Sequence, residues 1–217
     1  MAKEHHPDAS SHPWEKIYAR EGRVFTEHLP ALDEVAQRFQ AHQCQKVLDL
    51  GCGNGRHVVA LAGLGFQVIG LDISYTGLIL SQQWLEESSQ QAALVQSDTR
   101  QPLPLSGNSQ DGLMSTQVIH HALLDEVLMA ISEIYRILKP GGLAFVTVPC
   151  RSRSQRRSKS LQIEENTFLP LEGQEAGLPH HIFSEGRLRL AFQDFDIKEV
   201  SYRDQGRILA IWVQKPA

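Results

Sequence analysis

The sequence is poor in cysteine, has no long apolar stretch and carries no strong excess of either charge. Its three cysteines, Cys44, Cys52 and Cys150, are odd in number and form no C-x-x-C motif, which argues against a disulfide framework or a zinc knuckle. No apolar run approaches the length of a membrane-spanning helix, and the polar N-terminal region lacks the apolar core of a secretory signal. We therefore expect a soluble protein of the reducing cytoplasm, with no membrane partner.

The formal net charge of −4 over 217 residues provides no overall field that would hold a polyanion. Any contact with nucleic acid must therefore come from a local patch. One candidate is the basic segment, which contains Arg151, Arg153, Arg156, Arg157 and Lys159. It is either a solvated loop or a clamp for an anionic ligand, such as the phosphates of RNA. The overall charge favours a small-molecule ligand, and nothing in the sequence indicates the oligomeric state.

The order of the apolar segments predicts an α/β fold. Short apolar segments, typical of buried parallel strands, alternate with segments of helical periodicity. This alternation is the signature of βαβ units and of a mostly parallel sheet with helices on both faces. The connection over residues 149–181 is too long to be a plain loop in a compact domain, and is therefore functional or mobile. The expected strands are residues 46–50, 67–71, 92–96, 112–116, 143–148, 196–203 and 207–214, and the expected helices are residues 56–64, 76–87, 123–138 and 185–192.

Three glycines, Gly51, Gly53 and Gly55, follow the first expected strand. A turn between a buried strand and a helix presents free backbone N–H groups, and glycines allow a ligand to approach the backbone closely. The dinucleotide fingerprint G-x-G-x-x-G would need its third glycine at the position of Arg56. Asp49 precedes the turn, where a carboxylate suits the ammonium group of an amino acid better than a pyrophosphate. The methionine end of S-adenosylmethionine supplies such an ammonium group.

Two further carboxylates stand at the ends of the next expected strands. Asp72 closes the second strand, where a carboxylate can accept hydrogen bonds from both ribose hydroxyls. Asp98 follows the third strand, where it can accept from an adenine amino group, and Ile73 is placed to cover the ring. A single aspartate at a strand end is more often a turn former or a helix cap. The succession of such groups is what indicates an adenosine-containing cofactor.

The chain resembles the class I S-adenosylmethionine-dependent methyltransferases in five segments: VLDLGCGNG, GLDIS, SDTRQPLP, SQDGLMSTQVIHH and RILKPGG. The resemblance covers roughly residues 46–148. It implies a Rossmann-like, seven-stranded sheet with an antiparallel last strand, S-adenosyl-L-methionine as cofactor and S-adenosyl-L-homocysteine as product. It places Gly51 and Gly53 against the methionine part, Asp98 and Thr99 near adenine, and Gln117 by the amino acid. The expected cofactor-binding residues are Asp49, Gly51, Cys52, Gly53, Gly55, Asp72, Ile73, Asp98, Thr99 and Gln117.

We expect a flexible tail followed by one methyltransferase domain over residues 14–217. Residues 1–13 show no periodicity, whereas apolar residues recur at helical spacing in the segment that follows them. The expected divisions of the domain are an N-terminal helical cap at 14–43, the cofactor-binding core at 44–148, a substrate or lid loop at 149–183, and the final helix and strands at 184–217.

Methyl transfer from a sulfonium is an in-line displacement, so the protein mainly supplies alignment and a water-poor site, and a catalytic base is optional. His120 and His121 lie just past the fourth expected strand, close to the expected methyl group. They are candidate catalytic residues, although packing and helix capping explain the pair equally well. We expect His181 to face the substrate, and Trp14 and Tyr18, four residues apart on an expected helix, to act as lid residues.

The histidine doublets His120–His121 and His180–His181 raise the question of a metal site. Adjacent residues in an extended segment point to opposite faces, so a doublet rarely supplies two ligands. The sequence therefore predicts no metal.

The acceptor of the methyl group is open at this stage. Residues 163–183 resemble the tellurite-methyltransferase-like branch and other enzymes of small molecules, so a small-molecule acceptor leads. The segments VIHH, HHIFSEGRL and SYRDQGR are also similar to enzymes that methylate wobble uridine in tRNA. The Pro-Pro-Tyr signature of amino-methylating enzymes is absent, because Ser115–Val118 occupies its place. A non-catalytic partner protein with a methyltransferase fold is the third hypothesis.

Overall fold

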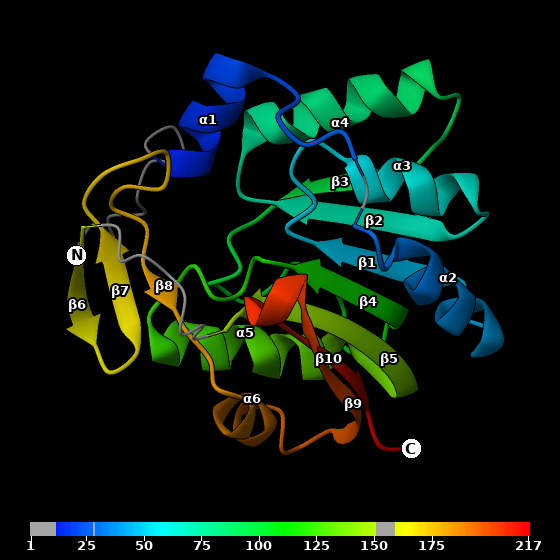
Figure 1. Cartoon of the computed structure of the whole chain (residues 1–217). Coiled ribbons are helices and arrows are strands. Elements are labelled where there is room, and N and C mark those ends of the chain that lie inside the picture. The colour runs from blue at the N-terminus through cyan, green and yellow to red at the C-terminus, as the bar shows by residue number, and fades with distance from the viewer. Residues whose placement is uncertain (1–11, 28, 151–158) are drawn as a thin grey trace, which may run out of the picture.

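The computed structural model describes residues 12–27, 29–150 and 159–217. Residues 151–158, which include four of the five cations of the basic segment, lie outside the described residues, as do residues 1–11 of the expected tail. Helices and strands alternate along the chain as the apolar pattern predicts (Figure 1). They are α1 (Pro13–Glu21), α2 (Leu32–Ala41), β1 (Lys46–Leu50), α3 (Arg56–Gly63), β2 (Gln67–Asp72), α4 (Tyr75–Glu87), β3 (Ala93–Gln96), β4 (Gln110–Thr116), α5 (Leu124–Ile137), β5 (Leu138–Pro149), β6 (Ser160–Glu164), β7 (Thr167–Pro170), β8 (His180–His181), α6 (Glu185–Ala191), β9 (Asp196–Arg203), the short 3-10 helix η2 (Asp204–Gly206) and β10 (Ile208–Gln214).

The main sheet has seven strands in the order β3-β2-β1-β4-β5-β10-β9. Neighbouring strands from β3 to β5 are parallel, whereas β10 runs antiparallel to both β5 and β9. Crossover connections through α3, α4 and α5 are required because parallel strands cannot be joined by a hairpin. The expected Rossmann-like sheet with an antiparallel last strand is confirmed.

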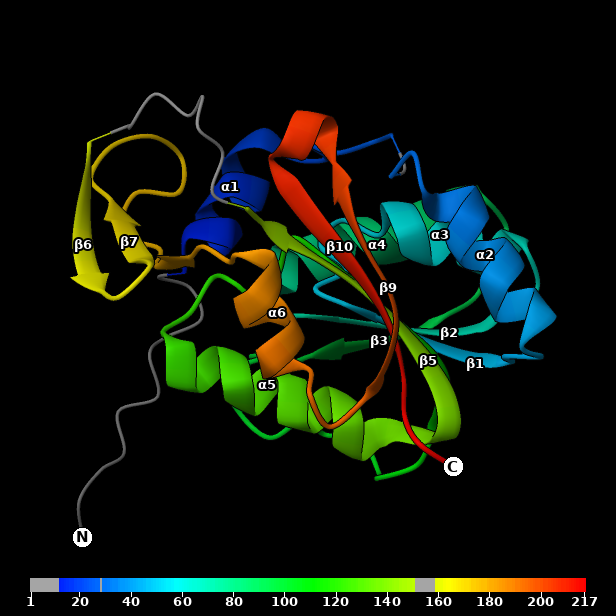
Figure 2. The ribbon, with the colours of Figure 1, turned by 60° about the horizontal axis from the view of Figure 1, so that its bottom comes forward.

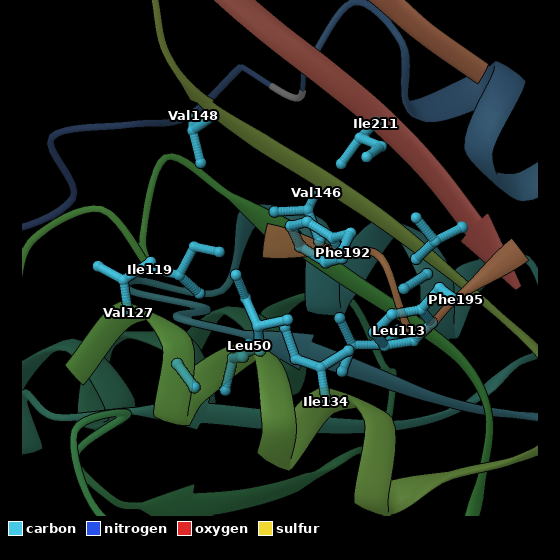
Figure 3. Close-up of a cluster of buried hydrophobic side chains, with 14 of the residues drawn as sticks. Leu50, Leu113, Ile119, Val127, Ile134, Val146, Val148, Phe192, Phe195 and Ile211 are labelled. Carbon is cyan, nitrogen blue, oxygen red and sulfur yellow. The ribbon is translucent and has the colours of Figure 1, made fainter. Parts of the chain in front are cut away.

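Helices cover both faces of this sheet and bury two apolar clusters. On one face, α2, α3 and α4 contribute residues such as Phe39, Leu61 and Leu85. On the other face, α5 and α6 pack over the sheet, as the view from below shows (Figure 2). Ile134 of α5 and Phe192 after α6 meet strand residues in this second cluster (Figure 3). The sheet is thereby held rigid, with its strand ends fixed relative to one another.

The N-terminal region differs from the expected helical cap. Pro13 begins α1, and the Nδ1 atom of His12 accepts from the backbone N–H of Trp14 at 3.3 Å, so these two residues belong to the helix start and not to a tail. The helix α2 is separate and packs on the sheet, where Phe39 meets the indole of Trp212 with ring centroids 5.9 Å apart. Of these two helices, α1 lies near the carboxyl ends of the strands and α2 does not (Figure 1). The expected cap is therefore one short helix.

The long connection after β5 is also not a plain loop. It contains a small antiparallel sheet in the order β6-β7-β8, which lies beside α1 in both views (Figures 1 and 2). The backbone N–H of His181 donates to the carbonyl of His120 at 2.8 Å and so ties β8 to the turn after β4. Two segments far apart in sequence are thereby joined at the carboxyl edge of the main sheet. Within the described residues, no helix is long and apolar enough to cross a membrane.

Candidate active site

A pocket of about 460 Å³ opens at the carboxyl ends of β1, β2 and β4, between the main sheet and α1. This volume is within the range of small-molecule and cofactor sites. Crevices at this edge are the usual ligand sites of open α/β sheets. The pocket is lined by His12, Trp14, Tyr18, Phe25, Gly51, Cys52, Gly53, Asn54, Arg56, His57, Asp72, Ile73, Ser97, Asp98, Thr99, Arg100, Thr116, Gln117, Val118, His120, His121, Pro149, Glu175 and His180.

Close approach of neighbouring groups explains the first two glycines of the turn after β1. A Cβ atom on Gly51 would lie 2.2 Å from a methyl group of Val118, and one on Gly53 would lie 2.2 Å from the hydroxyl oxygen of Tyr18. Both glycines have positive φ angles, of 80° and 57°, which other residues rarely adopt. Gly55 does not line the pocket; it precedes α3 and lets that helix approach Ser81. The structure gives it a packing role, and its contact with the cofactor stays a prediction.

Asp72 lines the pocket at the end of β2. One carboxylate oxygen accepts from the backbone N–H of Gly53 at 2.7 Å, and the other accepts from that of Ser74 at 2.8 Å. Burial raises the pKa of Asp72 to about 6, although these hydrogen bonds oppose the shift. Each oxygen can accept a further hydrogen bond, so the carboxylate can still receive ribose hydroxyls.

Asp49 is fully buried beneath the turn and does not line the pocket. Neither of its carboxylate oxygens has a hydrogen-bond partner among the described residues, and the Nδ1 atom of His57 lies 3.9 Å from one of them. Burial raises the pKa of Asp49 to about 7, with Asp72 adding to the shift and Arg56 opposing it. A buried carboxylate without a partner destabilises the protein when it is ionised. A cation held above the turn would offset that cost.

Asp98, Thr99 and Ile73, which the sequence predicts to bind the cofactor, all line the pocket. Arg100 was not anticipated there. Its guanidinium binds both carboxylate oxygens of Asp98, with the shortest contact at 2.6 Å. Although burial acts in the opposite direction, these bonds lower the pKa of Asp98. The carboxylate is therefore ionised and fixed in place, and its contact with adenine stays a prediction.

The helix α1 closes the pocket on the side away from the sheet. Its Glu15 accepts from the Ser74 hydroxyl at 2.6 Å and from the backbone N–H of Thr76 at 3.1 Å, which fastens α1 to the start of α4. Trp14 and Tyr18 face the pocket on the same side of the helix, with ring centroids 5.9 Å apart. The placement of both residues in a lid over the strand ends agrees with the sequence-based expectation.

Three histidines and one glutamate form a cluster in the wall of the pocket, here called the imidazole cluster: His120, His121, His180 and Glu175. The ring centroids of His120 and His121 lie 3.9 Å apart, and those of His121 and His180 lie 4.8 Å apart. The carboxylate of Glu175 lies 3.7 Å from Nε2 of His121 and 3.4 Å from Nε2 of His180. The rings of His120 and His121 therefore do not point to opposite faces, because the two residues lie in a turn and not in an extended strand.

His181 does not line the pocket, contrary to its expected role toward the substrate. It is 1% exposed, and its Nδ1 atom shares a hydrogen bond of 2.8 Å with the Thr167 hydroxyl. Its neighbour His180 faces the pocket instead. In a strand, successive side chains alternate between faces, so only one member of the doublet can face the ligand.

Comparisons with known proteins agree with this geometry. A family model described as a methyltransferase domain matches residues 48–146. The malonyl-(acyl-carrier protein) O-methyltransferase of Enterobacter lignolyticus is 33% identical over 153 residues, which cover 67% of this chain and 57% of that protein. Residues 48–146 form a methyltransferase domain of the class I S-adenosylmethionine-dependent type.

Solved structures show the same fold over nearly the whole chain. A protein from Pyrococcus horikoshii superposes with a TM-score of 0.73 and 19% identity, over 91% of this chain and 98% of the other. The 1,6-didemethyltoxoflavin-N1-methyltransferase of Burkholderia thailandensis, solved with S-adenosylhomocysteine, gives a TM-score of 0.69 and 18% identity, over 93% and 85%. The chain spans about half the length of the curated relatives it matches.

The residues of this class I chain fit the family's cofactor. Glycines at the turn leave the backbone open, Asp72 retains acceptor capacity, and the unpartnered Asp49 favours a positive charge nearby. Gln117 has a φ angle of 59° and donates through its side chain to the Thr147 hydroxyl at 3.2 Å. Non-glycine residues with a positive φ angle cluster at binding and active sites, where the surrounding structure holds the backbone in a strained conformation.

Several pocket residues were not anticipated from the sequence. Phe25 lies in an irregular stretch with no periodicity, and Glu175 lies in the long connection after β5. Both reach the pocket only through the tertiary fold. His12 and Arg100 stand next to residues already singled out, so proximity to Trp14 and Asp98 was the one signal that could have identified them.

Proposed function

We propose that the protein transfers a methyl group from S-adenosylmethionine to a small-molecule acceptor. One observation carries this proposal: the glycine turn, Asp72 and the imidazole cluster line the same pocket, together with Trp14 and Tyr18 of α1. The sulfonium of the cofactor supplies an already activated methyl group, so the main tasks of the protein are alignment and exclusion of water.

The cofactor half of the pocket supplies binding and orientation. We infer that backbone N–H groups of the turn and the carboxylate of Asp72 hold the methionine and ribose parts. Tyr18 covers Gly53 from the lid, so that ligand exchange requires α1 to move relative to the turn. In this proposal the hydrogen bonds of Glu15 to α4 stabilise the closed position of the lid.

A second cavity of about 450 Å³ lies against the first and provides a route for the acceptor. Trp14, Phe25, Glu175 and His180 line both cavities. The two aromatic rings, with centroids 6.1 Å apart, form an apolar wall beside the imidazole cluster. An acceptor that enters here would meet the methyl group next to these rings, in a site from which water is largely displaced.

His120 and His121 are weak candidates for a general base in this environment. Burial lowers the pKa of His121 to about 3, with the charge of His180 adding to the shift. Burial likewise holds the pKa of His120 well below its usual range. A general base works best when its pKa is near the working pH. We therefore propose that both imidazoles are neutral and act in acceptor positioning, which suffices for a soft or already anionic nucleophile.

Two measurements test the proposed function. Calorimetry of the full chain with S-adenosylmethionine should show binding, and failure of the wild type to bind would refute it. A panel of thiol, amine, carboxylate, hydroxyl and metalloid acceptors, assayed for S-adenosylhomocysteine release, would then identify the acceptor class. A non-catalytic partner protein would bind the cofactor but release no product with any acceptor.

Methylation of tRNA is the second candidate. The Enterobacter relative acts on an acceptor borne by a carrier protein, according to its name, so a macromolecular carrier is compatible with this family. The basic segment carries this alternative, but four of its five cations lie outside the described residues. A salt-sensitive gel shift of tRNA that is lost when those cations are neutralised would favour the RNA substrate.

A further inference from the structure

The imidazole cluster brings more ligand-type atoms together than methyl transfer requires. One ring nitrogen from each of His120, His121 and His180 lies within 4.8 Å of the other two. The carboxylate of Glu175 stands 3.4–3.7 Å from two of these rings. Imidazole nitrogens and a carboxylate oxygen are the ligand set of many catalytic zinc sites.

The cluster is also incompletely satisfied. His120 is 3% exposed, and its Nδ1 atom has no hydrogen-bond partner among the described residues. The Nε2 atom of His180 is buried and makes no hydrogen bond there, although the Glu175 carboxylate lies 3.4 Å from it. A buried polar atom without a partner costs about 1–3 kcal/mol of stability. A group that accepts electron pairs from both atoms would remove this cost.

We propose that His120, His121 and His180, assisted by Glu175, form a site for one divalent transition-metal ion of the zinc type. Two nitrogens on one tetrahedral zinc ion are roughly 3.4 Å apart. The ring nitrogens lie within 4.8 Å of one another, so side-chain rotations that move these atoms by about 1 Å bring them to that separation. The site lies where both cavities meet. An open coordination position would face the acceptor, where a metal ion favours the anionic form of an oxygen, sulfur or nitrogen nucleophile.

The role of the metal in activating an acceptor rests on the proposed function, whereas the test of metal binding does not. The metal site also opposes the sequence-based expectation of no metal, whose premise was that the rings of a doublet diverge. The structure shows those rings 3.9 Å apart. The geometry of the turn, which the sequence did not disclose, therefore reverses the argument.

The test is metal titration of the full-length protein after chelator treatment. His5 and His6 form another pair in the sequence, so the background carries H5Q and H6Q. Titration with Co²⁺ should give the visible absorption of a low-coordinate site at one ion per chain, and calorimetry with Zn²⁺ should give the same stoichiometry. H180A should weaken binding by more than about 100-fold, beyond the 10–100-fold loss typical of groups outside the coordination shell.

Matched variants make the result interpretable. His42 is exposed and remote from the pocket, so H42Q should bind metal as the background does. E175Q should weaken binding by at least about 10-fold. Circular dichroism and thermal melting check that H180A is folded, and H121N provides an independent test of a second ligand.

Absence of binding by the background protein, or equal affinity of folded H180A and H42Q, would overturn the metal site. S-adenosylmethionine binding is measured on the same samples. Cofactor binding without metal binding would refute this inference alone, whereas metal binding without cofactor binding would refute only the proposed methyl transfer.

Discussion

Replacement of Asp49 by asparagine should stabilise the cofactor-free protein, although it removes a residue of the family's turn. Burial raises the pKa of Asp49 to about 7 from an ordinary value of 3.8. Between these two values the folded state holds a proton that the unfolded state has released, so the stability of the wild type falls as pH rises. At 1.36 kcal/mol for each pKa unit, this shift costs the wild type about 4 kcal/mol at pH 8, where the folded carboxyl group is ionised, and about 2 kcal/mol at pH 5, where it is protonated.

Asparagine has nearly the size of aspartate but carries no charge. The wild-type carboxylate has no hydrogen bond to lose among the described residues, because neither oxygen has a partner. D49N should therefore gain about 4 kcal/mol at pH 8, which corresponds to a rise of roughly 10 °C in Tm for a chain of this size. The gain should shrink toward pH 5.

Urea denaturation of the cofactor-free protein at several pH values measures this difference. Asp111 provides a control of opposite sign, because its carboxylate accepts from two backbone N–H groups and pairs with Lys139. Although burial opposes them, these contacts lower its pKa, so D111N should lose stability at pH 8 and lose less as pH falls. A D49N protein that is no more stable than wild type at pH 8, or whose advantage does not shrink at lower pH, would refute the reasoning.

Three other changes test the cofactor half and the segment after β5. Gly53→Ala places a methyl group against Tyr18 at a positive φ angle, so urea denaturation should show a loss of about 1–2 kcal/mol and calorimetry a weaker cofactor affinity. Asp72→Asn should lower S-adenosylmethionine affinity by about tenfold or more in calorimetry, since hydrogen bonds to a charged group contribute about 1.5–3 kcal/mol; unchanged affinity would contradict its role. His181→Ala leaves the Thr167 hydroxyl without its ring partner and should cost about 1–3 kcal/mol in urea denaturation while cofactor affinity stays unchanged.

The cofactor half could be predicted because its signals are local in the sequence. The strands β2 and β3 are short apolar runs that end at the polar residues Asp72 and Gln96, so periodicity alone places Asp72 and Asp98 at one edge of the sheet. The strands at 46–50 and 196–203 were predicted with the bounds that the structure has. Successive crossovers then force neighbouring strand ends together without further information.

The N-terminal region and the small sheet after β5 could not be predicted in the same way. In the hairpin of β6 and β7, Leu161 and Ile163 are exposed, so no alternation of buried and exposed residues marks a strand. The strand β8 has only two residues, and it is recognised through pairing with β7. Such pairing is non-local, and a propensity argument over a short window does not detect it.

Which member of the His180–His181 doublet lines the pocket depends on register, and the sequence alone did not show that it is His180. In β8, His181 pairs with Thr167 and His180 pairs with Phe168, so a shift of one residue would exchange the buried ring and the pocket-facing ring. The hydrogen bond from the N–H of His181 to the carbonyl of His120 fixes that register against the main sheet. The imidazole cluster is thus assembled by backbone contacts between distant segments, such as that between His181 and His120, whereas the cofactor half is assembled by the order of the strands. If the proposed function holds, we therefore expect changes in the segment after β5 to alter the choice of acceptor while the glycine turn and Asp72 keep their positions.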